Sequence, residues 1–319
     1  MEQAARFGRK ALLGGDWRPW LARWLRRDDL APAAPATIVA AASDPSAAAD
    51  LNATAWFATP VYLIASLTSL HLDPRSILQL SPDERAVLAE DFNRTFADSH
   101  FRLHCVESGA LVMRARGAVN AVTTEPARAL ACELEAALPG GPDSAALKRL
   151  GAELEMWLHA HPVNEVRAGR GELPVSTLWL WGGGAVAAST AVTREDAASS
   201  DLLFGSEPYL TGLLRLQSAA PRALPDRLPD LRDHPGIQRM ALVAEITPLL
   251  HTNPQWTVFE ALADLDRRFL VPALAELRRG TTATVVFIAN DIQLRLQRGD
   301  LLKFWRRRRQ SVLDELRSM

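Results

Sequence analysis

One short region of the sequence places residues that could bind an anion close together. Asn164 and Arg167 lie three residues apart, on one turn of a predicted helix. A guanidinium can hold a phosphate or carboxylate with two hydrogen bonds. A glycine run that would let backbone N–H groups approach a ligand consists of Gly182, Gly183 and Gly184. In the alternative interpretation, Arg167 pairs with Glu165 or Glu172 and the glycines only turn the chain.

A second set of cations lies near the C-terminus. The basic side chains of this set are Lys303, Arg306, Arg307, Arg308 and Arg309. Because arginine binds phosphate well, nucleic acid and anionic lipid headgroups are candidate partners. On a helix beginning near Asp300, however, Phe304 and Trp305 would face the core while the arginines face solvent. We favour this solvated helix face over a nucleic-acid site.

Standard catalytic motifs are missing from the sequence. It contains no HExxH, no P-loop, no GxSxG, and no GxGxxG after a predicted strand. His159 and His161 are two positions apart, so they do not share a helix face. A capping or core role is therefore favoured over metal binding for both.

Composition indicates a cytoplasmic globular protein. The 319 residues are 48% hydrophobic and 23% charged, with a formal net charge of −1. This balance gives the whole chain no attraction to nucleic acid or anionic membranes. Cys105 and Cys132 fit two buried thiols in a reducing cytosol. The N-terminal residues do not resemble a signal peptide, and no apolar run is long enough to span a membrane.

The first half of the chain alternates predicted helices and strands. An amphipathic helix is predicted over residues 14–27 and a buried strand over 37–42. Ser81-Pro82-Asp83-Glu84 is typical of a capped helix start. Residues 100–106 and 110–116 form a predicted hairpin around Ser108-Gly109, and Asp143 is predicted to cap another helix.

In the second half, the predicted order is strand 177–181, strand 241–246, a long helix ending at Gly280, and strand 284–289. A strand, a helix of about twenty residues and a strand are typical of a parallel βαβ unit. The sequence therefore predicts an α/β protein with a mostly parallel sheet.

The most specific motif is HPVNxxR at residues 161–167, followed by Gly171, Pro174 and WLWGGG at residues 179–184. It resembles the archaeal-type cofactor-independent phosphoglycerate mutases, and the similarity covers residues 55–184 well and 241–291 weakly. Length and the short N-terminal half resemble the bacterial regulatory proteins of the RpfE type. The resemblance implies an alkaline-phosphatase-like core sheet flanked by helices, with an inserted smaller α/β lobe. The expected parts are 1–60 (helices and first core strand), 61–160 (the lobe) and 161–319 (the rest of the core and a basic helix).

The resemblance also implies two divalent metals and a phosphorylated Ser or Thr, which together transfer a phosphoryl group. The chain departs from this pattern where the family carries its metal ligands. No Asp-Gly follows residues 37–43, and Asn290-Asp291 stands where the family has Asp-His. Glu245, His251 and Asp291 are only weak candidates for one metal site.

The leading functional hypothesis is a phosphoglycerate-mutase-like protein without an intact two-metal site. It would act without catalysis as a regulatory or scaffolding protein, binding a small phosphorylated or anionic ligand or a protein partner, with no cofactor. One alternative is a phosphoglycerate mutase or phosphatase with a rearranged site, which would need Mn²⁺ or Mg²⁺. The other is a nucleic-acid-associated factor acting through the C-terminal arginines.

Overall fold

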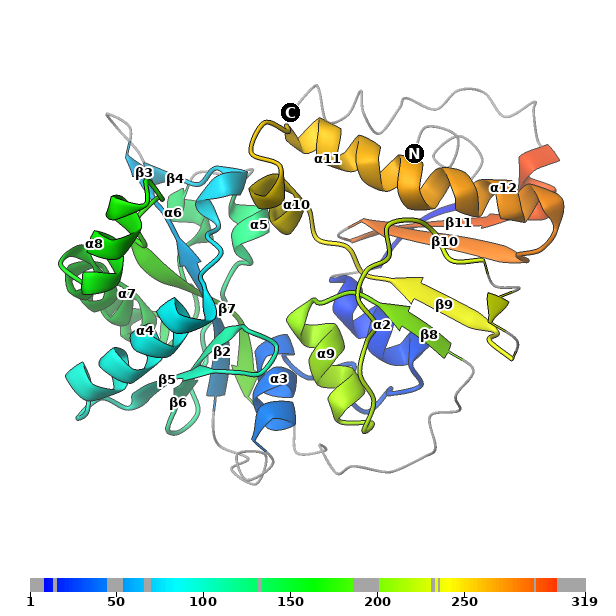
Figure 1. Cartoon of the computed structure of the whole chain (residues 1–319). Coiled ribbons are helices and arrows are strands. Elements are labelled where there is room, and N and C mark those ends of the chain that lie inside the picture. Colours follow the sequence, from blue (N-terminus) through cyan, green and yellow to red (C-terminus); the bar gives the residue numbers. More distant parts are fainter. Residues whose placement is uncertain are drawn as a thin grey trace.

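The structure is a computed structural model that describes residues 9–13, 16–44, 54–65, 70–130, 134–185, 201–230, 233–234, 236–289 and 291–302. Its helices and strands form three neighbouring layered assemblies (Figure 1). The predicted mixed α/β class is confirmed. The division at residues 60 and 160 stays a prediction; strands that begin at Thr54 and at Thr177 lie next to each other in one sheet.

The largest sheet has the strand order β5-β6-β2-β7, and every neighbouring pair in it is antiparallel. Its strands are β5 (Phe101–Cys105), β6 (Leu111–Ala115), β2 (Thr54–Val61) and β7 (Thr177–Ala185). The predicted β5–β6 hairpin is confirmed, and Gly109 turns it with a φ of 81°. β7 is longer than predicted because it continues through the three glycines.

Three helices cover one face of this sheet: α4 (Pro82–Thr95), α7 (Ser144–His159) and α8 (Pro162–Gly169). The predicted capping box at the start of α4 is confirmed. The Ser81 N–H donates to Glu84 Oε2 at 2.7 Å, and the Glu84 N–H donates to Ser81 Oγ at 3.2 Å. The shared core includes Trp56, Phe92 and a row of leucines on α7. Those leucines, predicted as the apolar face of the helix, are Leu147, Leu150, Leu154 and Leu158.

The opposite face is covered by α3 (Pro35–Ser43), α5 (Pro126–Ala129) and α6 (Leu134–Ala137). The strand predicted over residues 37–42 was wrong, since this segment is helix α3. Residues 36–41 are buried all round, so the sequence shows no helical periodicity. Pro35 in the first turn and the alanines that follow favour the helix.

A second assembly consists of α2 (Trp17–Trp24), α9 (Pro208–Arg215), β8 (Asp201–Phe204) and β9 (Arg239–Leu242). β8 and β9 pair in parallel, and Arg239 Nε donates to Asp201 Oδ1 at 2.8 Å. The strand predicted over 241–246 corresponds to β9, which ends at Leu242. The helix α10 (Ile246–Thr252) begins where the predicted strand was to end.

The third assembly carries the long helix predicted to end at Gly280. It runs as α11 (Val258–Leu265), the π-helical segment η4 (Asp266–Leu270) and α12 (Val271–Arg279), and lies beside a three-stranded sheet (Figure 1). That sheet has the antiparallel order β1-β11-β10, with β1 (Arg9–Leu12), β10 (Thr284–Ala289) and β11 (Ile292–Gln297). The 3₁₀ helix η5 (Arg298–Leu302) follows β11.

The predicted parallel βαβ unit was wrong. β9 and β10 belong to different sheets, and β10 turns back tightly into β11, with Ala289 opposite Ile292. The sequence carries a hairpin signal here, because the turn residues Asn290-Asp291 are followed by the alternating apolar residues Ile292, Leu294 and Leu296. This signal favours a hairpin over the predicted parallel βαβ unit. Among the described strands, β8 and β9 are the only parallel pair, so the mostly parallel sheet is not found in this part of the chain.

Short elements complete the first assembly. β3 (Ile64–Ala65) pairs with β4 (Leu70–His71), and the 3₁₀ helix η2 (Pro74–Ser76) follows. None of the helices in the described ranges is long and apolar enough to cross a membrane.

Candidate ligand-binding pocket

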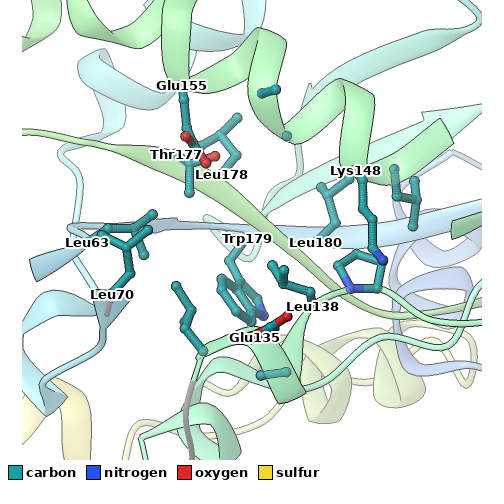
Figure 2. A pocket seen from close by; sticks show the side chains of 16 residues that line it. Leu63, Leu70, Glu135, Leu138, Lys148, Glu155, Thr177, Leu178, Trp179 and Leu180 are labelled. Carbon is teal, nitrogen blue, oxygen red and sulfur yellow. The ribbon is translucent and has the colours of Figure 1, made fainter. Parts of the chain in front are cut away.

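A cavity of about 760 Å³ lies beside β7 (Figure 2). Residues from both faces of this strand line it, namely Thr177 and Trp179 on one side and Leu178 and Leu180 on the other. Consecutive strand residues point to opposite faces of a sheet. The cavity therefore runs along the edge of β7.

The two walls of the pocket differ in character. On one side, Trp179 packs with α5 and α6, and its indole N–H donates to the Thr124 carbonyl at 2.7 Å, which fixes the ring. Leu63, Leu70 and Leu138 complete this apolar wall. On the other side, α7 presents the small residues Gly151 and Ala152 between two charged side chains. The small residues leave the space that the pocket occupies.

Three charged side chains line the pocket. Lys148 and Glu155 are seven residues apart on α7, so they share a face about 10 Å apart. Glu135 extends from α6 on the opposite side of β7 (Figure 2). None of the three has an ion-pair partner among the described residues, and all three are exposed. Desolvation raises the pKa of the Glu155 carboxyl above its ordinary value.

The predicted anion site is occupied by contacts within the protein. Arg167 is 4% exposed; its Nε donates to the Leu173 carbonyl at 2.7 Å, and its Nη1 contacts Glu84 at 3.1 Å and Glu172 at 3.2 Å. Burial alone would raise the pKa of Glu84, but the hydrogen bond from Ser81 N–H and the charge of Arg167 outweigh it and lower the pKa. The pairing of Arg167 with Glu172 supports the structural alternative.

Asn164 is likewise engaged by the backbone. Its Nδ2 donates to the carbonyls of Leu158 at 2.8 Å and Val175 at 3.0 Å, and its Oδ1 accepts from the Val175 N–H at 2.7 Å. This side chain joins α7, α8 and the segment leading into β7. Its role as a ligand contact stays a prediction.

The glycine run permits close packing. A Cβ on Gly183 would lie 2.0 Å from the Trp56 ring, and a Cβ on Gly182, whose φ is 65°, would lie 3.2 Å from Phe57. A Cβ on Gly184 would lie 3.0 Å from Ala34. Neighbouring side chains therefore occupy the space next to these glycines, and their predicted ligand role remains untested.

The three weak metal candidates have separate surroundings. His251 Nε2 is 2.7 Å from the Ile77 carbonyl, and the Asp291 backbone at the β10–β11 turn accepts from Leu13 N–H at 2.7 Å. Glu245 lies at the start of α10, under the electrostatic influence of Glu207 and Arg18. No group of three or more His, Cys, Asp or Glu residues that could hold a metal occurs in the described ranges.

Sequence reasoning missed an ionic cluster around Arg18, which is 3% exposed. Its Nη2 contacts Glu207 Oε1 at 3.1 Å and Glu125 Oε1 at 2.9 Å, and its Nη1 contacts Asp16 Oδ2 at 2.5 Å. The guanidinium also lies 4.8 Å from the Trp181 ring centroid. Asp16 is two residues from Arg18, but Glu125 and Glu207 are 107 and 189 residues away, so no local motif predicts the whole cluster.

Burial and mutual repulsion shift the acids of this cluster. Burial raises the pKa of Glu207 despite the opposing attraction of Arg18. The pKa of Glu245 is raised to about 7, first by desolvation and then by the charge of Glu207. Glu245 is exposed as a whole residue, yet the protein around its carboxyl is dense enough for desolvation to dominate. The cluster links α2 and α9 to α5.

One histidine behaves as predicted. His161 is buried at the start of α8, and its Nδ1 accepts from the Val163 N–H at 3.2 Å, which caps the helix. Its Nε2 lies 3.3 Å from Asp91 Oδ2. The basic residues Lys303, Arg306, Arg307, Arg308 and Arg309 lie outside the described residues.

Comparison with solved structures gives several matching chains. The structure is similar to the cofactor-independent phosphoglycerate mutase from Thermoplasma acidophilum DSM 1728. The match has a TM-score of 0.37 and 16% sequence identity, and it covers 93% of this chain and 81% of that one. At these values the likeness assigns no activity to the chain, and the closer RpfE-type resemblance stays a prediction. No family model and no curated protein matches the sequence.

Proposed function

We propose that this protein acts by binding rather than by catalysis, as a phosphoglycerate-mutase-like regulatory or scaffolding protein. The pocket beside β7 is its ligand site. The observation that carries this proposal is a cavity of about 760 Å³ with an apolar wall and three charged side chains that have no ion-pair partner among the described residues. Ligand sites typically have volumes of about 300–1,000 Å³ and combine apolar walls with a few polar groups.

Exposed apolar side chains support a binding role. Leu70 is 42% exposed and Leu138 is 43% exposed, and both line the pocket. Removing such surface from water contributes roughly 25 cal/mol per Å² to binding. A ligand that covers these leucines and the Trp179 ring therefore gains most of its affinity there.

The polar groups of the pocket fit recognition better than chemistry. A nucleophile needs a base within hydrogen-bonding distance. Thr177 contributes a side chain to the pocket, and no hydrogen bond joins it to a carboxylate among the described residues. Glu135 and Glu155 outnumber Lys148, so the pocket favours a neutral or cationic ligand over the anionic ligand expected from the sequence.

The neutral apolar dye Nile red tests whether the pocket binds ligands. Ala152→Trp places an indole in the cavity from an exposed position on α7, so the fold is expected to tolerate it. Ala146→Trp is the matched control, because Ala146 is exposed on the same helix and does not line the cavity. We expect Ala152→Trp to weaken dye binding about tenfold in a fluorescence titration, since each 1.4 kcal/mol of lost contact is tenfold.

The control variant should bind the dye within about twofold of the unmodified protein. Melting temperatures of both variants, measured in parallel, show that each is folded. Dye binding that is equal in the unmodified protein and Ala152→Trp would place the ligand elsewhere and contradict the proposal.

A further inference from the structure

The pocket lies against a strand that pairs on one side only with the other described strands. β7 stands at the end of the order β5-β6-β2-β7 among the described strands. The part of β7 that lines the cavity is Thr177–Leu180, opposite Val61–Ala58 of β2. An edge strand carries backbone donors and acceptors with no partner strand, and such edges readily accept another strand.

Pro60 shows which backbone groups point toward the cavity. It lies opposite Leu178, has no N–H, and its carbonyl accepts from the Leu78 N–H at 2.9 Å on the other side of β2. The Pro60–Leu178 pair is therefore not hydrogen-bonded. Because bonded and non-bonded pairs alternate in antiparallel sheets, Leu178 and Leu180 direct their N–H and C=O groups to the free edge.

The side-chain surroundings alternate as an added strand requires. Leu178 and Leu180 pack on the α7 side of the sheet, whereas Trp179 packs on the α6 side. In an antiparallel addition, residues opposite Leu178 and Leu180 would point toward α7, and the residues between them would point toward Trp179. A chain in the pocket would thus meet apolar surface with every second side chain.

The charged side chains of α7 indicate which positions of an added strand would carry charged residues. Figure 2 shows Glu155 beside Thr177 and Leu178, and Lys148 beside Leu180. Neither side chain has a partner among the described residues. A basic side chain opposite Leu178 and an acidic one opposite Leu180 would complement both.

We propose that the pocket binds an extended peptide segment of a partner protein, added antiparallel to the edge of β7. Its apolar side chains contact Trp179, and an acidic and then a basic side chain contact Lys148 and Glu155. The inference rests on the proposed function, because it takes the same pocket as the ligand site. Strand addition draws affinity from main-chain hydrogen bonds and specificity from alternate side chains. Four strand residues span about 13 Å, so a pentapeptide is long enough to test it.

The probe is fluorescein-labelled Val-Glu-Val-Lys-Val-amide, with binding to the full chain measured by fluorescence anisotropy. Two isomers carry two N-methyl groups each, either on Glu and Lys or on the third and fifth residues. In the proposed register the Glu and Lys N–H groups face β7 and the valine N–H groups face away. We expect methylation at Glu and Lys to weaken binding at least tenfold, and methylation at the valines to change it less than threefold.

Charge recognition is tested with Glu155→Gln, which should weaken binding of the unmodified peptide about two- to fivefold, as an exposed ion pair allows. Glu153→Gln is the matched control, because Glu153 lies on the same helix and does not line the pocket. Equal affinities of the two methylated isomers, the reverse order, or no binding of the unmodified peptide would overturn the inference.

Nile red separates this inference from the proposed function. If the dye binds, Ala152→Trp weakens it, and the peptide does not bind, the pocket remains a ligand site and the peptide inference fails. If Ala152→Trp leaves dye binding unchanged, the proposed function fails as well.

Discussion

At the scale of single residues, the motif that carries the family resemblance holds the fold together. Arg167 contacts Glu84, Glu172 and a backbone carbonyl, and Asn164 hydrogen-bonds to the backbone. Gly183 provides room for the Trp56 ring. The residue types resemble a binding motif, and their contacts serve packing between β2, β7 and α8.

Gly183→Ala is expected to destabilise the protein by about 1–3 kcal/mol, the usual cost of overpacking a core. An added Cβ would lie 2.0 Å from the buried Trp56 ring, so the ring or the strand must shift. Chemical denaturation measures the change in the free energy of unfolding.

Gly169→Ala is the control for this substitution, because nothing lies within 4 Å of its added Cβ and the residue is at the end of α8. The control should be neutral or slightly stabilising, since alanine reduces the entropy of the unfolded chain. Equal stability of Gly183→Ala and the unmodified protein would show that the glycine run has no packing role.

At the scale of elements, the sequence predicts those whose local signals agree. The capped start of α4 and the β5–β6 hairpin combine turn chemistry with periodicity, and the leucine face of α7 follows the helical period. The strand predicted over residues 37–42 was wrong because a short apolar run fits a strand and a buried helix equally well. The prediction that β9 and β10 lie in one sheet was wrong. The pairing of a strand depends on segments outside it, and here β9 pairs with β8 and β10 pairs with β11.

The candidate site shows the same limit. Small residues at 151–152 between Lys148 and Glu155 on one helix face are visible in the sequence. What turns them into a pocket is the position of β7 at the end of the sheet formed by the described strands, together with Leu63, Leu70 and Leu138 from other parts of the chain. Sequence periodicity contains no information on which strand lies at an edge.

At the scale of the whole molecule, the Arg18 cluster connects the assemblies. The guanidinium of Arg18 contacts carboxylates of the N-cap residues of α2, α5 and α9, and lies 4.8 Å from the ring centroid of Trp181 in β7. Breaking a buried ion pair by removing one partner leaves an uncompensated charge. The relative placement of the assemblies is therefore expected to depend on the protonation of this cluster.

The raised pKa of Glu245 predicts how the stability of the protein changes with pH. Its pKa is raised to about 7, chiefly by desolvation, whereas the unfolded chain has the ordinary value of about 4.3. Between these values the folded state binds more protons than the unfolded state, so its stability falls as pH rises. Relative to Glu245→Gln, the free energy of unfolding should decrease from pH 4.5 to 7 and level off above.

Urea titrations at several pH values measure this difference, and Glu153→Gln on α7 serves as the control substitution. If the difference in the free energy of unfolding between the unmodified protein and Glu245→Gln is constant with pH, Glu245 does not make the stability of the Arg18 cluster depend on pH.

The central claim is that the molecule binds rather than catalyses, and turnover tests it most directly. Purified protein with excess Mn²⁺ is assayed for phosphoglycerate mutase and phosphatase activity beside a mock preparation from cells without the gene. The account predicts no turnover above the mock, because Glu245, His251 and Asp291 have separate surroundings. Turnover by the unmodified protein that disappears in Asp291→Ala would contradict the account and establish an enzyme with a rearranged metal site.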